Sequence, residues 1–427
     1  MSELSLGHFL SNEYVIPVFL LTIFLASLIA TRVKIPYTMI LVAIGISISV
    51  MDFTGHGIQN IAGFKVDPKL ILYFVIPPLI FEAMMKIDRE QFKTIRISAL
   101  ALATVGVALA TIVGGLLLSY LAGLPTLVAF AFAALIAPTD AAIVIEVFKR
   151  VKIPKTLATL MESEASFNDA TGVIIFSSIM AIAASQGSSL STENISGINV
   201  NILETIGHFA WVFFGGIAIG VGLGVGSQFL HKLIEEPFSE TALSVATLFG
   251  SVVISNALGF SGLVAAAAAG LWFGVIMRKP NIMGEKVRAY ASNFWEMIAF
   301  FANSVAFLYL GLNMDMARIG QNLPLIALAI IAVLAARAAS TYPILAATHR
   351  FTKEKTTGAW RHVIMIGGMR GALSVALVAT LPESDMKEIL KTITFGVVLS
   401  SLIIQYPVLS RYIKKAFPEA MQEPKSI

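Results

Sequence analysis

The chain has 427 residues, of which 57% are hydrophobic and only 13% charged, and its formal net charge is +4. This composition is too apolar for a soluble protein of that length and indicates a membrane protein. The absence of cysteine excludes disulfides, thiolate metal sites and cysteine nucleophiles.

Apolar segments follow one another along almost the whole chain, separated by short polar loops. Each is long enough to cross a bilayer as a helix. We therefore predict an all-α polytopic membrane protein with thirteen transmembrane helices and no separate soluble domain. The predicted spans are 13–31, 36–51, 69–86, 96–121, 126–148, 155–185, 204–230, 239–258, 261–277, 291–313, 322–349, 358–382 and 386–413.

Positive charge alternates from loop to loop along these spans. Of the 30 Lys and Arg residues, 23 lie in loops that follow odd-numbered spans or in the C-terminal tail, and five lie in the other loops. The remaining two, Arg337 and Arg370, lie inside spans. By the positive-inside rule, the C-terminus is cytoplasmic and the N-terminus is outside.

The odd number of spans fits two six-helix halves, with the seventh span at 204–230 between them. The added span inverts the second half relative to the first, which is typical of transporters with inverted repeats. The fifth span of each half is interrupted, by A-P-T-D at 137–140 and by G-G-M-R-G at 367–371. Backbone opened at membrane depth is tolerated only where it is buried in protein or lines a cavity. The two broken helices therefore predict a site near the middle of the membrane.

Three acidic residues lie within the sixth span, in the string E-S-E-A-S-F-N-D at 162–169. Glu162, Glu164 and Asp169 each cost at least about 3 kcal/mol when ionised in a span, so they indicate an ion or proton pathway. The competing interpretation is an ion pair that holds helices together. Glu164 and Asn168 are four residues apart and share a helix face, whereas Asp169 is turned by about 100° from Asn168.

Asp140 follows the interruption of the fifth span, where the freed carbonyl of Thr139 is a second oxygen donor. Carboxylates, backbone carbonyls and water are the ligands that hard alkali cations prefer. Asp140 and Asp169 can also take up protons, and burial disfavours the charged form of a carboxyl group. One site can therefore serve two competing ions.

Two guanidinium groups at membrane depth also need partners, because arginine does not lose its proton. We predict an ion pair between Arg337 and Glu164, since the small residues around Arg337 allow close helix approach. For Arg337 and Arg370 we favour a structural role over ion transport. Glu82, near the cytoplasmic end of the third span, fits a solvated position and the ion pathway equally well. Glu296 is interpreted as a local partner at the end of a span.

Several motifs, in the same order along the whole chain, resemble those of the prokaryotic monovalent cation:proton antiporters of the NhaP and sodium–hydrogen-exchanger branch. They are L-I-F-E-A, A-P-T-D-A-A, E-S-E-A-S-F-N-D-A, the lone Arg337 and G-G-M-R-G-A-L-S-V-A-L. The resemblance implies an NhaA-like fold, alternating access and a homodimer. It implies a dimerisation part at 13–86 and 239–313, a core part at 96–185 and 322–413, and a linking helix at 204–230.

The resemblance also implies residue roles. Asp169 would be the shared ion-binding carboxylate, with Asp140, the Thr139 carbonyl and Glu82 contributing, and the Asn168–Asp169 pair is the mark of electroneutral exchange. The family has serine directly after the glutamate, where this chain has Ala165. A hydroxyl ligand would then come from Ser166, or water would replace it.

The function predicted is antiport of Na⁺ or Li⁺ against H⁺ across the cell membrane, without a cofactor, enzymatic activity or a nucleic acid partner. A K⁺/H⁺ antiporter stays open as the alternative. A cation channel fits less well, because no selectivity-filter sequence is found. An intramembrane hydrolase would need a nucleophile and base or a metal motif such as H-E-x-x-H, and the sequence has none.

Overall fold

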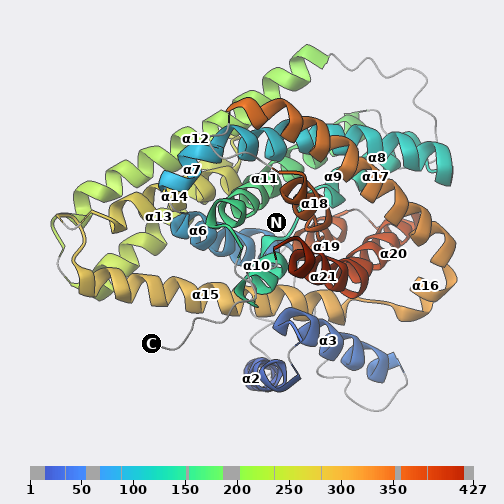
Figure 1. Ribbon diagram of the computed structural model, residues 1–427, viewed down its shortest axis with the longest axis horizontal. Helices are drawn as coiled ribbons and strands as arrows, with labels where there is room; N and C mark the ends of the chain where they lie inside the picture. The colour runs from blue at the N-terminus through green and yellow to red at the C-terminus, as the bar shows by residue number, and fades with distance from the viewer. Residues whose placement is uncertain are drawn as a thin grey trace.

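The computed structural model describes residues 15–33, 35–53, 68–87, 89–150, 153–185, 202–234, 236–279, 281–351, 357–381 and 383–417. All regular elements in these ranges are helices, which confirms the predicted all-α class (Figure 1). The two chain termini, to which the charge pattern assigns opposite sides of the membrane, lie outside the described residues.

The first half of the chain contains α-helices and two short π-helical segments, η1 and η2. Each π-helical segment continues directly into the next α-helix. In chain order they are α2 (Val15–Val33), α3 (Tyr37–Phe53), α5 (Pro68–Leu70), η1 (Ile71–Val75), α6 (Ile76–Lys86), α7 (Arg89–Ala101), η2 (Leu102–Gly106), α8 (Val107–Ala122), α9 (Thr126–Ile136), α10 (Ala141–Arg150) and α11 (Lys155–Ser185).

The second half begins with a long helix in the range predicted to link the two halves. Its helices are α12 (Ile202–His231), α13 (Pro237–Ala257), α14 (Gly262–Met277), α15 (Glu285–Leu312), α16 (Met316–Gln321), α17 (Leu323–Thr348), η3 (His349–Phe351), α18 (Gly358–Ile366), α19 (Ala372–Ala379), α20 (Asp385–Ser400), η4 (Ser401–Gln405) and α21 (Tyr406–Ala416).

Helices occupy most of every predicted span, and the helix is interrupted at the two predicted places. The chain leaves helix between α9 and α10, at Ala137–Asp140, and between α18 and α19, at Gly367–Gly371. We call these segments the first and second interruptions. Seven helical stretches within the described residues are long and apolar enough to cross a membrane.

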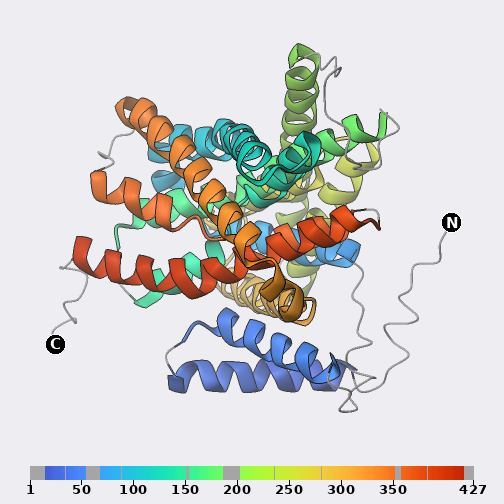
Figure 2. The same ribbon diagram turned by 90° about the vertical axis from the view of Figure 1, so that its right-hand side faces the viewer.

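The helices pack in two groups. In one, α6, α12, α13, α14 and α15 contact mainly one another, and α3 packs on α15. In the other, α17 packs on α8 and α20, and α9 lies between α8 and α11. Figure 2 shows α2 and α3 as the blue pair at the lower edge, beyond the rest of the molecule.

Helix α11 lies between the two groups and carries the acidic string. It packs against α7 and α9 on one side and against α6, α12 and α14 on the other. The surrounding helices bury Asn168 completely and leave Glu164 only 1% exposed. Polar groups so deep must find partners within the protein, and these partners form the site described next.

Candidate cation-binding site

The first and second interruptions lie against each other. The Asp140 N–H donates a hydrogen bond to the Met369 carbonyl at 2.8 Å. The Arg370 guanidinium, 2% exposed, donates to the carbonyls of Ala137 and Pro138, the latter at 3.1 Å. Proline has no N–H to donate, and the open backbone leaves carbonyls without helical partners. The Arg370 guanidinium, from the second interruption, therefore pairs with carbonyls of the first. The partner that Arg370 was expected to need is therefore a pair of carbonyls.

Gly371 allows the Asp140 side chain to approach the second interruption. A Cβ at Gly371 would lie 2.1 Å from Asp140 Oδ2 and 2.6 Å from Asp140 Cβ. Contacts that close to the root of a side chain leave no room for a larger residue. The glycine thus leaves free the space that the Asp140 carboxylate occupies.

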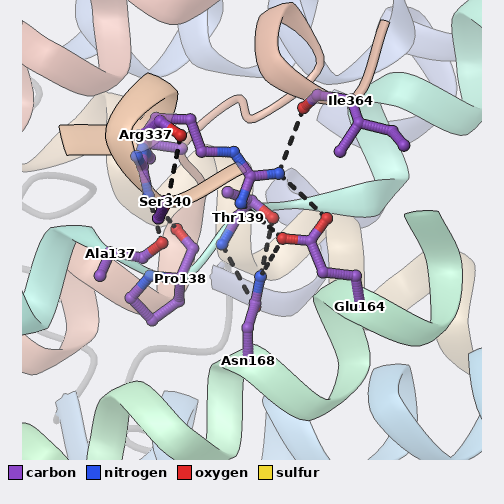
Figure 3. A network of polar contacts seen from close by, with 9 residues as sticks. Ala137, Pro138, Thr139, Glu164, Asn168, Arg337, Ser340 and Ile364 are labelled. Carbon is purple, nitrogen blue, oxygen red and sulfur yellow. Dashed lines mark hydrogen bonds and ion pairs between the residues drawn. The ribbon is translucent and has the colours of Figure 1, made fainter. Parts of the chain in front are cut away.

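Asn168 connects α11 to the first interruption through two hydrogen bonds (Figure 3). Its Nδ2 donates to Thr139 Oγ1 at 2.8 Å, and the Thr139 N–H donates to its Oδ1 at 3.3 Å. Asn168 Nδ2 also lies 3.4 Å from Glu164 Oε1, as the spacing of four residues predicts. The amide therefore holds Thr139 in place without adding charge.

Glu164 and Arg337 form the predicted ion pair between α11 and α17. Arg337 Nη1 lies 2.5 Å from Glu164 Oε1, and Nη2 lies 3.0 Å from Oε2. Arg337 Nη2 also donates to the Ile364 carbonyl, near the end of α18, at 3.2 Å. Figure 3 shows this guanidinium between the Glu164 carboxylate and Ile364. The pair joins the acidic helix to the second broken helix.

A cavity of about 720 Å³ lies beside this network and reaches the acidic residues. It extends to Lys86 and Glu296, whose side chains are 43% and 62% exposed, so its rim is open to the surroundings. Asp140 and Asp169 line its wall together with Gly371. Two carboxylates, one from the first interruption and one from α11, thus share one accessible space.

The cavity divides the predicted site residues into two sets. Those that line it are Asp169, Asp140, Thr139, Glu82 and Ser166. Those that belong to the buried network outside its lining are Asn168, Glu164, Arg337 and Arg370. The sequence had placed the first set at the cation and the second in structural or pathway roles, and these roles stay predictions.

Ala165 and Ser166 both line the cavity, and the Ser166 hydroxyl donates to the Glu162 carbonyl at 2.9 Å. A hydroxyl donor of this kind still has lone pairs for a cation. Glu82 lies at the cavity, where its Oε1 is 2.5 Å from Lys86 Nζ. The sequence had counted Lys86 only as a loop charge, although its spacing of four residues from Glu82 was visible.

Oxygen donors and ionisable carboxylates around an accessible cavity suit a small cation that exchanges with a proton. The carboxylates of Asp140 and Asp169 would supply charge, and oxygens of Thr139 and Ser166 would supply neutral donors. The guanidinium groups of the network are turned to Glu164 and to carbonyls instead. The charge of these two guanidinium groups is thereby kept behind the wall of the cavity, whereas the Lys86 ammonium lies at its rim.

Comparison with known proteins identifies the family that carries this arrangement. The model of the transmembrane sodium/hydrogen exchanger family matches residues 19–415, nearly the whole chain. The chain belongs to the sodium/hydrogen exchanger family. Its relatives include the Na⁺/H⁺ antiporter ApNhaP of Aphanothece halophytica, 32% identical over 90% of this chain and 70% of the relative. The low-affinity Na⁺/H⁺ antiporter NhaS1 of Synechocystis is 30% identical over 87% of this chain and 68% of its own length.

The fold of this family member is also that of a solved antiporter. The structure of the sodium proton antiporter MjNhaP1 from Methanocaldococcus jannaschii superposes with a TM-score of 0.74 at 19% identity. The match covers 96% of this chain and 99% of the other. The arrangement of helices around the two interruptions is therefore a membrane antiporter fold.

Proposed function

We propose that this protein is a secondary antiporter that exchanges Na⁺, or Li⁺, for H⁺ across the cell membrane. The observation that carries the proposal is the cavity in which Asp169 and Asp140 lie on one wall beside the first interruption. Membership of the sodium/hydrogen exchanger family and the relatives named as Na⁺/H⁺ antiporters support the same function.

Asp169 is the group on which cation and proton compete. It lies next to Asn168, which is tied to Thr139, so the helix turn that presents Asp169 is fixed relative to the first interruption. Deprotonated Asp169 would hold the cation with oxygens of Thr139, Asp140 and Ser166, and protonated Asp169 would release it. Neighbouring Asn168 is neutral, so one carboxylate alternates between one cation and one proton.

Transport then requires the site to face each side of the membrane in turn. The two packing groups of helices, with the cavity between them, support a motion of the core part against the rest. We propose thirteen spans in two inverted halves, joined by α12, with the N-terminus outside. We also propose a homodimer, with its contacts in the part that contains α2, α3 and α13–α15. Both rest on the charge pattern and the resemblance.

The test is cation-driven proton flux in liposomes that contain purified protein, with Na⁺, Li⁺ and K⁺ added in turn. Asp169→Asn and Asp169→Ala should abolish exchange while the protein still folds, and Asp385→Asn, an exposed acid at the start of α20, should behave like wild type. Substantial exchange by Asp169→Ala would remove Asp169 from this role. Flux with K⁺ but neither Na⁺ nor Li⁺ would favour the K⁺/H⁺ alternative.

A further inference from the structure

Lys86, the last residue of α6, places an ammonium group at the rim of the cavity. Its Nζ lies 2.5 Å from Glu82 Oε1 and 3.8 Å from Glu296 Oε2 on α15. All three side chains line the cavity, and Glu82 is the innermost by exposure, at 14%. A cation that enters from this rim therefore meets a carboxylate that already has a positive partner.

The end of α6 is held so that Lys86 stays at this rim. Arg278, just after α14, donates through Nη2 to the carbonyls of Ile87 at 2.6 Å and Lys86 at 3.3 Å. Helix α14 can come this close because Gly274 has no side chain. A Cβ at this position would lie 2.3 Å from the Met85 carbonyl oxygen. The last turn of a helix also favours a cation, because its carbonyl ends carry partial negative charge. Arg278 thus holds the backbone of Lys86, and the carboxylates of Glu82 and Glu296 attract its ammonium group.

We propose that Lys86 is a tethered cation that competes with the transported cation for Glu82. It thereby lowers the apparent affinity of the protein for the transported cation from this side. The inference rests on the proposed function, in which this cavity is the route to Asp169. An ammonium group and an alkali cation both seek carboxylate oxygens, and they repel each other when they share one. Removing the lysine charge leaves Glu82 and Glu296 to attract the cation unopposed.

The experiment compares variants by sodium-dependent proton flux in everted membrane vesicles at fixed pH. Lys86→Met and Lys86→Gln remove the charge and keep most of the chain length, whereas Lys86→Arg keeps the charge. Glu296→Gln changes the rim charge in the opposite direction. Lys93→Met is the matched control, because Lys93 forms a similar pair with Glu90, 2.7 Å away, with both side chains exposed and outside the cavity lining.

We expect Lys86→Met and Lys86→Gln to lower the KM for Na⁺ about threefold, as one unit charge a few ångströms away would do in a high dielectric. Lys86→Arg and Lys93→Met should keep the wild-type KM, Glu296→Gln should raise it, and the maximal rate should change less than the KM. Added choline chloride should shrink these differences, because salt screens charge but not packing.

An unchanged KM in both neutral variants, or an equal change in Lys86→Arg, would overturn the proposal. This outcome can be told apart from failure of the proposed function, because that function is tested separately, by loss of exchange in Asp169→Asn in the same vesicles. If Asp169→Asn kept exchange, the role of Asp169 would fall, and the KM comparison at Lys86 would still decide whether its charge acts on the entering cation.

Discussion

Arg337 engages both carboxylate oxygens of Glu164, at 2.5 Å and 3.0 Å, with less than a tenth of either side chain exposed. A buried charge pair of this kind is weak evidence for net stability, because desolvation of both groups offsets their attraction. Its more certain effect is to make each partner costly to remove alone.

We therefore predict that the pair is strongly coupled. Glu164→Gln and Arg337→Gln should each reduce the free energy of unfolding by about 3–5 kcal/mol, because each leaves an uncompensated buried charge. The double variant should lose much less than the sum, as seen by thermal unfolding of the purified protein. The exposed Glu90–Lys93 pair, treated in the same way, should give small and nearly additive losses. Additive losses at Glu164 and Arg337 would show that each depends on other partners.

Arg370 should be needed to keep the two interruptions together. Arg370→Gln replaces the guanidinium that donates to the buried carbonyls of Ala137 and Pro138 with a shorter amide, and each carbonyl left unpaired costs about 1–3 kcal/mol. We expect a lower unfolding temperature and little sodium-driven proton flux. Arg411→Gln, on the exposed face of α21, serves as the control. Wild-type stability in Arg370→Gln would mean that other groups satisfy these carbonyls.

Gly371→Ala should impair transport by displacing Asp140 rather than by unfolding the protein. The added Cβ would lie 2.1 Å from Asp140 Oδ2 and 2.6 Å from its Cβ, so the carboxylate has to move. We expect the flux to fall at least about tenfold, as for other small displacements at a reaction site. Gly358→Ala has nothing within 4 Å and should transport normally. Normal flux in Gly371→Ala would show that the position of Asp140 is not critical.

Exchange should be electroneutral, with one cation for one proton. Asn168 bonds Thr139 through its amide and carries no charge, and we expect Asp140 to keep one protonation state, so that Asp169 alone alternates. Sodium-driven proton flux in sealed liposomes should therefore be the same with and without a potassium–valinomycin clamp. If an imposed membrane potential alone drove the exchange, a second proton-binding group would be required. Asp140, on the same cavity, would be the first to test by substitution.

Features that depend on local composition could be predicted from the sequence. The long apolar segments located the helices, and proline and paired glycines located both interruptions, because these residues oppose helix wherever they occur. The Glu164–Arg337 contact was also predictable. Each charge is buried within a span and needs an opposite charge.

Contacts to neutral groups far apart in the chain could not be predicted. Nothing in the sequence says that Arg370 reaches the carbonyls of Ala137 and Pro138, because every residue offers the same backbone acceptor. The bond from Asn168 to Thr139 is hidden for a similar reason. Lys86 appeared as one of several charges at the end of a span, and only the structure shows that it borders the cavity with Asp140 and Asp169.

The contacts that join the interruptions have a consequence for the direction of transport. Asp140 is bonded to Met369 and Arg370 to Ala137, while Asn168 ties α11 to Thr139, so these segments are bound into one body. A carrier whose binding groups are fixed to one another holds the ion with the same donors whichever side of the membrane the site faces. The site can therefore load in either orientation, and for one-to-one exchange the same molecule runs backwards when the two ion gradients are reversed.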